Sequence, residues 1–416
     1  MELSIKNIGK IETADIEIKG VTVITGYNST GKSSVCKALY GIMESYSNMN
    51  RKVFVQRRSS MASAVWGWQK QISETTNVDD EALDEFADDI MDLIYELDEF
   101  NDHCISVERL VELQEENELD IPAEDLQKLI EKFEEIINRD KDEYVRFIVA
   151  QKMRNVFSDQ IGHVNLNKLS QIQLLENNRS YSVVFEGNTL VESSYTNTLF
   201  QKPIYIEPAS VLDNCENMGR RIQTGRREEP IRSFLLADEM TGERLTLEQY
   251  QERESNIKII REILESVTNG HLVKNQETKL SYAEKGLKSS IACSNIASGL
   301  KPFLLLQRMV ENGSLEAGRL LIIDEPEVNL HPAWQLKFAK VLVLLNTELK
   351  IQVVISTHSP YFLKAVDFYM EEQENAENGR YYLTKETSND LYTLVDVTNN
   401  KELIYKTMYE PLEEID

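Results

Sequence analysis

A strand-like segment that runs directly into a glycine-rich loop constrains the fold of this chain more than any other feature. Residues 21–25 are V-T-V-I-T, which is typical of a strand buried on both faces. Residues 26–34 read G-Y-N-S-T-G-K-S-S and contain the G-x-x-x-x-G-K-S spacing of a phosphate-binding loop. Residues 35–42 are mostly apolar and predict the helix that must follow such a loop. The order strand, loop and helix predicts an α/β nucleotide-binding fold.

The residues of this loop have distinct expected roles. Backbone N–H groups at a helix N-terminus bind phosphate, a lysine supplies positive charge, and a hydroxyl ligates Mg²⁺. A glycine-rich turn without a ligand is the alternative, and it explains neither Lys32 nor Ser33. We expect nucleotide binding by Gly26, Asn28, Ser29, Thr30, Gly31, Lys32, Ser33 and Ser34, with Ser33 also a metal ligand.

Two later apolar segments end in residues suited to nucleotide hydrolysis. Residues 320–323 are L-L-I-I and run into Asp324, a candidate Mg²⁺ ligand through water, and Glu325, a candidate general base. Residues 352–357 form a second such segment, followed by His358, whose ring can donate a hydrogen bond to a γ-phosphate. Each segment alone is also compatible with an ordinary core strand. With the phosphate loop upstream, catalytic roles for Glu325 and His358 are the stronger interpretation.

Composition limits the expected partners and compartment. The net charge of −25 opposes nonspecific binding to nucleic acids and anionic membranes, so a nucleic-acid contact would need a local basic patch. No apolar run approaches the roughly 18 residues that span a bilayer, and the N-terminus lacks a signal-peptide core. The four cysteines form no C-x-x-C pair. We expect a cytoplasmic protein without a membrane partner. The candidate basic patches are Arg51, Lys52, Arg57 and Arg58, and Arg220, Arg221, Arg226 and Arg227.

The pattern along the chain predicts a head interrupted by helices. Residues 79–100 and 123–137 carry apolar side chains at three- and four-residue spacing, and no lysine or arginine occurs from Gln71 to Ser106. These helices predict a solvated helical subdomain or, alternatively, a docking surface for a basic partner protein. The predicted parts are 1–45 (head with phosphate loop), 46–160 (helical insertion), 161–235 (β-rich part of the head), 236–290 (helical and strand segment) and 291–416 (C-terminal part of the head).

Three motifs together resemble ATPase heads of the ABC type, in the branch that contains SMC, RecF and the OLD-like ATPases of bacterial antiphage defence. They are residues 26–34, D-E-P-E-V-N-L-H-P at residues 324–332, and S-T-H-S-P at residues 356–360. The resemblance implies an α/β P-loop ATPase with ATP and Mg²⁺ as cofactors. It implies a two-lobed head with a mostly parallel sheet and N-terminal antiparallel strands, interrupted by a coiled-coil-like helical insertion.

The same resemblance implies a homodimer or higher homo-oligomer, in which each ATP site is completed by a signature loop from the opposite subunit. The candidate loop is residues 295–301, with Ser298, Gly299 and Lys301 as the contacts in trans. The family's Leu-Ser-x-Gly-x pattern aligns its serine with Ala297, so Ser298 takes that place only after a one-residue shift. This departure allows weak, partner-activated hydrolysis. Gln201 and Glu207 are candidates for the family's glutamine that couples Mg²⁺ to the insertion.

Three functions remain compatible with these motifs. The leading one is an ATPase that acts as sensor or scaffold and controls a separate effector, a nuclease or toxin, in antiphage defence, as in Septu-like or PARIS-like systems. The residues after Pro360 are too few for the Toprim nuclease domain of OLD nucleases. The alternative is a RecF- or SMC-like DNA-binding ATPase of recombination or repair. A transporter nucleotide-binding subunit is a minor alternative, which the acidic insertion disfavours.

Overall fold

The chain divides into two compact units in the computed structural model. Unit 1 comprises Met1–Ser47 and Ala150–Asp416, and unit 2 comprises Asn48–Val149. Each unit has its own core and is described by itself. The structure describes residues 1–76, 78–97, 105–163, 168–196, 201–207, 212, 228–237, 246–274, 280–388 and 390–410.

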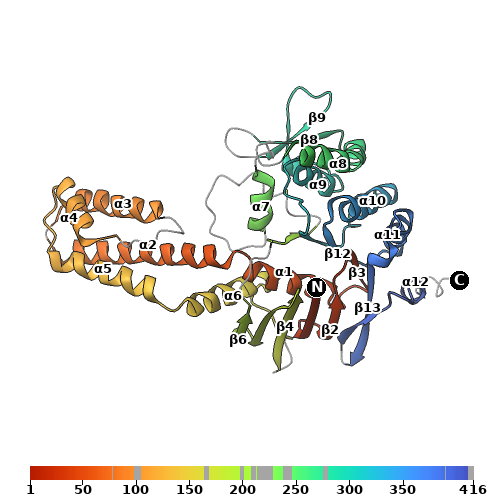
Figure 1. Ribbon diagram of the computed structural model, residues 1–416, viewed down its shortest axis with the longest axis horizontal. Coiled ribbons are helices and arrows are strands. Elements are labelled where there is room, and N and C mark those ends of the chain that lie inside the picture. Colours follow the sequence, from red (N-terminus) through yellow and green to blue (C-terminus); the bar gives the residue numbers. More distant parts are fainter. Residues whose placement is uncertain are drawn as a thin grey trace. The chain divides into compact units, whose positions relative to one another are not determined.

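Unit 1 is built on an eleven-stranded mixed sheet (Figure 1). The strand order is β6-β5-β4-β1-β2-β14-β13-β3-β12-β11-β7. The strands of this sheet are β1 (Glu2–Ile8), β2 (Ile11–Glu17), β3 (Val21–Thr25), β4 (Leu169–Glu176), β5 (Arg179–Glu186), β6 (Thr189–Tyr195), β7 (Ile204–Ile206), β11 (Leu320–Asp324), β12 (Gln352–Thr357), β13 (Gly379–Ser388) and β14 (Leu391–Asp396).

The sheet has a parallel part and an antiparallel part. Strands β13, β3, β12, β11 and β7 pair in parallel, whereas β6, β5, β4, β1 and β2 pair antiparallel. The hairpin of β13 and β14 joins them, because β14 pairs in parallel with β2. The α/β fold with parallel strands and N-terminal antiparallel strands is therefore confirmed.

Helices cover the parallel strands on both faces, which is why these strands are apolar throughout. On one face, helix α1 contacts β11 and β12. On the other, Val21, Val23 and Ile355 belong to a core that includes side chains of α8–α11. The helices of this unit are α1 (Lys32–Tyr46), α7 (Glu228–Leu236), α8 (Leu247–Thr268), α9 (Lys301–Glu311), α10 (Pro332–Leu349), α11 (Pro360–Glu372) and α12 (Glu402–Tyr409), with a small sheet of β8 (Gly270–Lys274), β9 (Leu280–Glu284) and β10 (Ile291–Ala292).

Unit 2 is helical, as its apolar spacing predicts. It contains α2 (Met49–Thr75), α3 (Asp80–Glu96), α4 (Val107–Glu116), α5 (Ala123–Asn138) and the first half of α6 (Lys141–Phe157). Its core includes Phe86, Ile90 and Phe133. Asp79 and Ser106 accept hydrogen bonds from backbone N–H groups in the first turns of α3 and α4, which fixes where these helices begin. Among the described residues, no helix is both long and apolar enough to cross a membrane.

Two arginines of the first candidate basic patch, Arg57 and Arg58, make contacts within unit 2. The guanidinium of Arg57 donates to the carbonyl of Arg139 and lies over the ring of Tyr144. That of Arg58 lies over the rings of Phe54 and Tyr95. These contacts favour a structural role for both arginines. The second patch, Arg220, Arg221, Arg226 and Arg227, lies outside the described residues.

Candidate nucleotide-binding site

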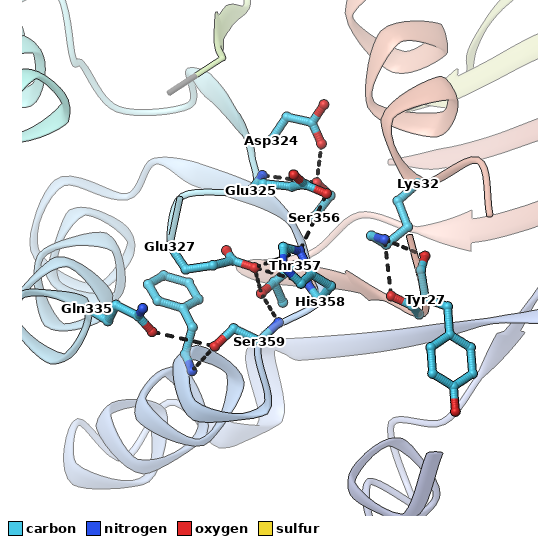
Figure 2. Close-up of polar contacts among 12 residues, drawn as sticks. Tyr27, Lys32, Asp324, Glu325, Glu327, Gln335, Ser356, Thr357, His358 and Ser359 are labelled. Carbon is cyan, nitrogen blue, oxygen red and sulfur yellow. Dashed lines mark hydrogen bonds and ion pairs between the residues drawn. The ribbon is translucent and has the colours of Figure 1, made fainter. Parts of the chain in front are cut away.

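Strand register brings the predicted site residues to one edge of the sheet. In the parallel pairs, Thr25 of β3 lies beside Thr357 of β12, and Ser356 of β12 lies beside Asp324 of β11. The residues that follow, Gly26, His358 and Glu325, therefore leave the sheet at the same carboxyl edge. Ligands of open α/β sheets bind at this edge. Figure 2 shows Lys32 and the acidic residues of this edge together.

The phosphate loop has the backbone conformation that its glycines permit. Gly26 and Gly31 have φ values of 145° and 95°, and Ser29 is left-handed at 61°. A Cβ atom on Gly26 would lie 1.8 Å from Oγ1 of Thr384, so only glycine fits there. Asn28 and Ser29 are exposed at the tip of the loop. No side chain caps the N-terminus of α1, so its backbone N–H groups are available to an anion.

Lys32 is held inside the loop. The residue is 4% exposed, and its ammonium donates to the carbonyl oxygens of Gly26 and Tyr27 at 3.0 and 2.7 Å (Figure 2). Burial lowers the pKa of Lys32, while Glu325 and Asp324 act in the opposite direction. The ammonium of Lys32 is thus held by two carbonyls within the loop, and a bound polyphosphate could replace these carbonyls as its partner.

The hydroxyl-bearing residues of the loop have different environments. Thr30 donates to the carbonyl of Tyr27 and accepts from Thr384, so its side chain braces the loop. Ser34 lies against the β1–β2 turn, since a Cβ on Gly9 would be 2.8 Å from its Oγ. Ser33, in the first turn of α1, is half-buried. Ser33 remains the best candidate for a metal ligand among the three.

Asp324 is fixed by hydroxyl groups on two neighbouring strands. Oδ1 accepts from Ser356, and Oδ2 accepts from the hydroxyl of Tyr205 at 3.1 Å. Because side chains alternate along a strand, Asp324 and Ser356 point to the α1 face, where the buried Cys36 lies. Burial raises the pKa of the Cys36 thiol well above its ordinary value, with a further contribution from Asp324. The carboxylate is therefore directed toward the start of α1, where Ser33 and Lys32 lie.

Glu325 and His358 form the polar end of the neighbouring strands. Glu325 has a left-handed backbone (φ 51°), and its N–H donates to the carbonyl of Ser356 at 3.0 Å. Its Oε1 lies 3.5 Å from Nδ1 of His358, and both side chains are about one-third exposed (34% and 37%). Nδ1 of His358 is also 3.3 Å from Oε1 of Glu327. The predicted general base and the predicted γ-phosphate contact are thus neighbours.

The predicted signature residues lie on the loop that begins α9. Ser298 is exposed, whereas Gly299 and Lys301 are buried. A Cβ atom on Gly299 would lie 2.6 Å from the carbonyl oxygen of Asn329, in the turn that follows Glu325. Only Ser298 is therefore open to a second subunit through its side chain. At Gly299 the loop lies against the turn that follows Glu325 in the same chain.

The two candidates for the coupling glutamine lie at opposite edges of the sheet. The side chain of Gln201 reaches the carbonyl of Ala317, before the start of β11. Glu207 follows β7 at the site edge, where the Tyr205 hydroxyl lies 3.1 Å from Oδ2 of Asp324 and 3.4 Å from Oε1 of Glu207. Gln201 precedes β7 and lies at the end of the strand away from Asp324, which does not suit the expected role. Glu207 follows β7 and lies at the same edge of the sheet as Asp324.

Sequence reasoning missed three contributors. Tyr205 positions Asp324, Thr384 packs on the phosphate loop, and Glu327 contacts His358. Glu327 had a local signal, because it lies within the D-E-P-E motif. Tyr205 and Thr384 had none, because strand pairing alone brings them to the site.

The AAA ATPase domain family matches residues 69–363 of this chain. The chain belongs to this family. The matched range includes Asp324, Glu325 and His358 and begins after the phosphate loop, so the loop is an independent indication of nucleotide binding in this AAA ATPase-domain protein.

A curated relative and several solved structures are also similar to the chain. The "Retron Vc95 probable ATPase" of Vibrio cholerae serotype O1 biovar El Tor is 34% identical over 120 residues, which are 28% of this chain and 22% of that protein. The chain thus matches about a fifth of that relative's length. An SMC head bound to the C-terminal winged-helix domain of ScpA is 11% identical, with a TM-score of 0.48 over 97% of this chain and 98% of that one. The Thermotoga maritima SMC head domain is 11% identical, with a TM-score of 0.37 over 95% and 98%.

The residues present fit ATP and Mg²⁺. The loop offers N–H groups in left-handed backbone and a lysine that donates to two carbonyls of the loop. Within the described residues, no group of three or more His, Cys, Asp or Glu side chains is arranged to hold a metal alone. Mg²⁺ usually takes one or two protein oxygens and completes its shell with phosphate and water. Ser33 and Asp324 match that requirement.

Proposed function

We propose that this protein binds and hydrolyses ATP at the carboxyl edge of the parallel strands. The observation that carries the proposal is the register of β3, β12 and β11, which gathers Lys32, Asp324, Glu325 and His358 at that edge. Few alternatives account for a buried lysine facing three carboxylates beside an uncapped helix N-terminus. When bound, Mg²⁺ would neutralise phosphate charge and fix its geometry.

Each residue then has a defined task. The N–H groups of residues 28–34 and the ammonium of Lys32 bind the phosphates, and Ser33 and Asp324 hold the metal. Glu325 orients the attacking water and accepts its proton, since its carboxylate is partly exposed at the strand end. His358, adjacent to Glu325, donates to the γ-phosphate. Tyr205 and Ser356 keep the Asp324 carboxylate in place.

We infer that a second copy of the chain contacts the outer side of the γ-phosphate. Ser298 is an exposed residue of the predicted signature loop, near the N-terminus of α9, which favours an anion. We infer a homodimer that closes on ATP and opens after hydrolysis. Turnover should then rise more than linearly with protein concentration.

The decisive experiment measures phosphate release by the purified full chain with ATP, with and without Mg²⁺, over a range of protein concentrations. We expect Mg²⁺-dependent release whose specific rate increases with concentration until dimers dominate. Tight ATP binding without release, at every concentration and with any partner protein added, would refute hydrolysis and leave a nucleotide-binding role.

We further propose that ATP-driven closure controls a separate effector, a nuclease or toxin, in antiphage defence. The retron relative supports a defence role over a repair role. The structural use of Arg57 and Arg58 weakens the alternative of a RecF- or SMC-like DNA-binding path. Co-expression with the neighbouring genes followed by affinity capture tests this. Capture of a nuclease or toxin that is released or activated by nucleotide is expected, whereas salt-sensitive DNA binding by the chain alone would favour repair.

A further inference from the structure

A buried carboxyl group lies behind the catalytic residues and has no part in the roles given above. Glu327 is 6% exposed, in the turn between β11 and α10. Its Oε1 accepts from Oγ1 of Thr357 at 2.7 Å and from the backbone N–H of His358 at 3.0 Å (Figure 2). The same oxygen is 3.3 Å from Nδ1 of His358. The carboxyl thus touches the peptide, the ring and the preceding side chain around one histidine.

Two polar atoms in this cluster are left without hydrogen bonds. Among the described residues, neither Oε2 of Glu327 nor Nδ1 of His358 has a hydrogen-bond partner, although both atoms are buried. An unmatched buried polar atom costs about 1–3 kcal/mol. The charged or titratable groups that face the cluster are Glu325 after β11, Lys32 of α1 and His358 itself. A small rotation of the ring would satisfy Nδ1 with either carboxylate.

Fold stability alone does not explain a carboxyl at this position. Burial raises the pKa of Glu327 even though Thr357 and the His358 backbone donate to it, so the net environment disfavours its charge. A neutral or apolar side chain would fill the turn without that cost. Groups that oppose stability in this way are concentrated at functional sites.

We propose that Glu327 is a positioning residue for His358, whose carboxylate accepts the Nδ1 proton and holds the ring so that Nε2 serves the nucleotide. The partner of one ring nitrogen determines the protonation and orientation of the other. With Nδ1–H held by Glu327 and with Glu325 close by, the orientation of the ring is fixed, and the direction of Nε2 is fixed with it. The effect on turnover rests on the proposed ATPase function, while the state of the ring does not.

The test combines ring ¹⁵N NMR of the nucleotide-free full chain with steady-state kinetics. The chain has five histidines, and His358→Gln identifies the His358 signals. In the wild type we expect Nδ1 of His358 to be protonated. In Glu327→Gln the amide can donate to Nδ1, so the Nε2–H tautomer should replace the Nδ1–H form. The other four rings are internal controls, and Glu371→Gln, an exposed carboxyl of α11, is the matched substitution.

Steady-state kinetics distinguish an effect on the position of the His358 ring from an effect on ATP binding. Glu327→Gln should lower kcat, because the ring is no longer held by the carboxylate, by about 10- to 100-fold if the effect matches that of hydrogen-bond partners of metal-bound histidines, with KM for ATP nearly unchanged. Wild-type ring signals in a folded Glu327→Gln protein overturn the proposal, whatever the turnover. If Glu327→Gln changes the tautomer of His358 but the wild-type protein does not hydrolyse ATP, the positioning role is supported and the proposed ATP hydrolysis is overturned.

A second variant tests the proposal if Glu327→Gln does not fold. Thr357→Val keeps the shape of the β12 end and Glu327 itself but removes the 2.7 Å hydrogen bond to Oε1. The carboxyl is then held less firmly, and the His358 signals should move in the same direction by a smaller amount. Signals identical to those of the wild type in this variant would also overturn the proposal.

Discussion

The hydroxyl of Tyr27, in the phosphate loop, donates to the backbone carbonyl of Thr407 in α12 at 2.7 Å. It also lies 3.3 Å from Oε2 of Glu410. The carbonyl of the same tyrosine accepts from Lys32, so one residue connects this lysine with α12. Polyphosphate binding has to draw Lys32 away from this carbonyl. We therefore expect the position of α12 to depend on the occupancy of the loop.

Tyr27→Phe removes only the hydroxyl and should loosen α12. Amide hydrogen exchange in residues 402–409 should become faster in the nucleotide-free protein, because the hydroxyl no longer holds this helix at Thr407. ATP binding should change little, since the loop backbone is kept. Tyr361→Phe, on an exposed tyrosine of α11, is the control. Equal exchange rates in Tyr27→Phe and the wild type would show that the contact carries no stability.

Lys32→Ala should abolish the stabilisation of the protein by ATP. A ligand present at 100 times its Kd stabilises the folded state by about 2.7 kcal/mol, which raises the Tm of the wild type. Without the ammonium, that rise should disappear, measured by thermal unfolding with and without MgATP. Lys6→Ala, on an exposed lysine of β1, controls for the loss of a positive charge and should keep the rise. A full ATP-dependent rise in Lys32→Ala would contradict the assignment of this site.

Glu325→Gln should stop hydrolysis while preserving ATP binding. General bases contribute about 10²- to 10⁴-fold, so phosphate release should fall by at least about 100-fold. The amide keeps the size of the carboxylate, and the backbone N–H of residue 325 still donates to Ser356. ATP should therefore trap a dimer that is visible by size-exclusion chromatography with light scattering. Release at the wild-type rate would show that another group accepts the proton.

The positions of residues within local motifs could be predicted from the sequence. The phosphate loop, Asp324, Glu325 and His358 each follow an apolar strand segment, and parallel strands bring their carboxyl ends together. The α/β fold followed from the same pattern. The amphipathic helices of unit 2 also follow directly from apolar spacing.

Residues whose role depends on strand order could not be predicted. Thr384 reaches the phosphate loop only because β13 pairs with β3, although 354 positions separate it from Thr30. Tyr205 is 119 positions from Asp324 and reaches it through the β7–β11 pair. The sequence did not show which of Gln201 and Glu207 lies at the site edge, because this depends on the position of β7 between them. These contacts have no periodic or motif signal.

Because the carboxyl of Glu327 is buried, we expect the difference in stability between the wild type and Glu327→Gln to depend on pH. Burial raises its pKa, so the folded state holds this proton to higher pH than the unfolded chain does. Stability from this group is therefore full below the ordinary glutamate pKa of about 4.3 and falls as pH rises through the folded pKa. Glutamine does not ionise, so Glu327→Gln should gain Tm relative to the wild type as pH increases. A constant Tm difference between acidic and neutral pH would contradict this.

Gly299→Ala should destabilise the contact between the signature loop and the catalytic turn. The new Cβ would lie 2.6 Å from the carbonyl oxygen of Asn329, so one of the two backbones has to move, at a cost of about 1–3 kcal/mol. Gly67→Ala is the matched control, because nothing lies within 4 Å of a Cβ there and alanine is favoured in a helix by about 0.5–1 kcal/mol. Chemical unfolding should show loss in the first variant and no loss in the second. Because Asn329 follows Glu325 and Glu327 in the same turn, ATP turnover of Gly299→Ala should also fall, and undiminished turnover at full dimer formation would separate this contact from catalysis.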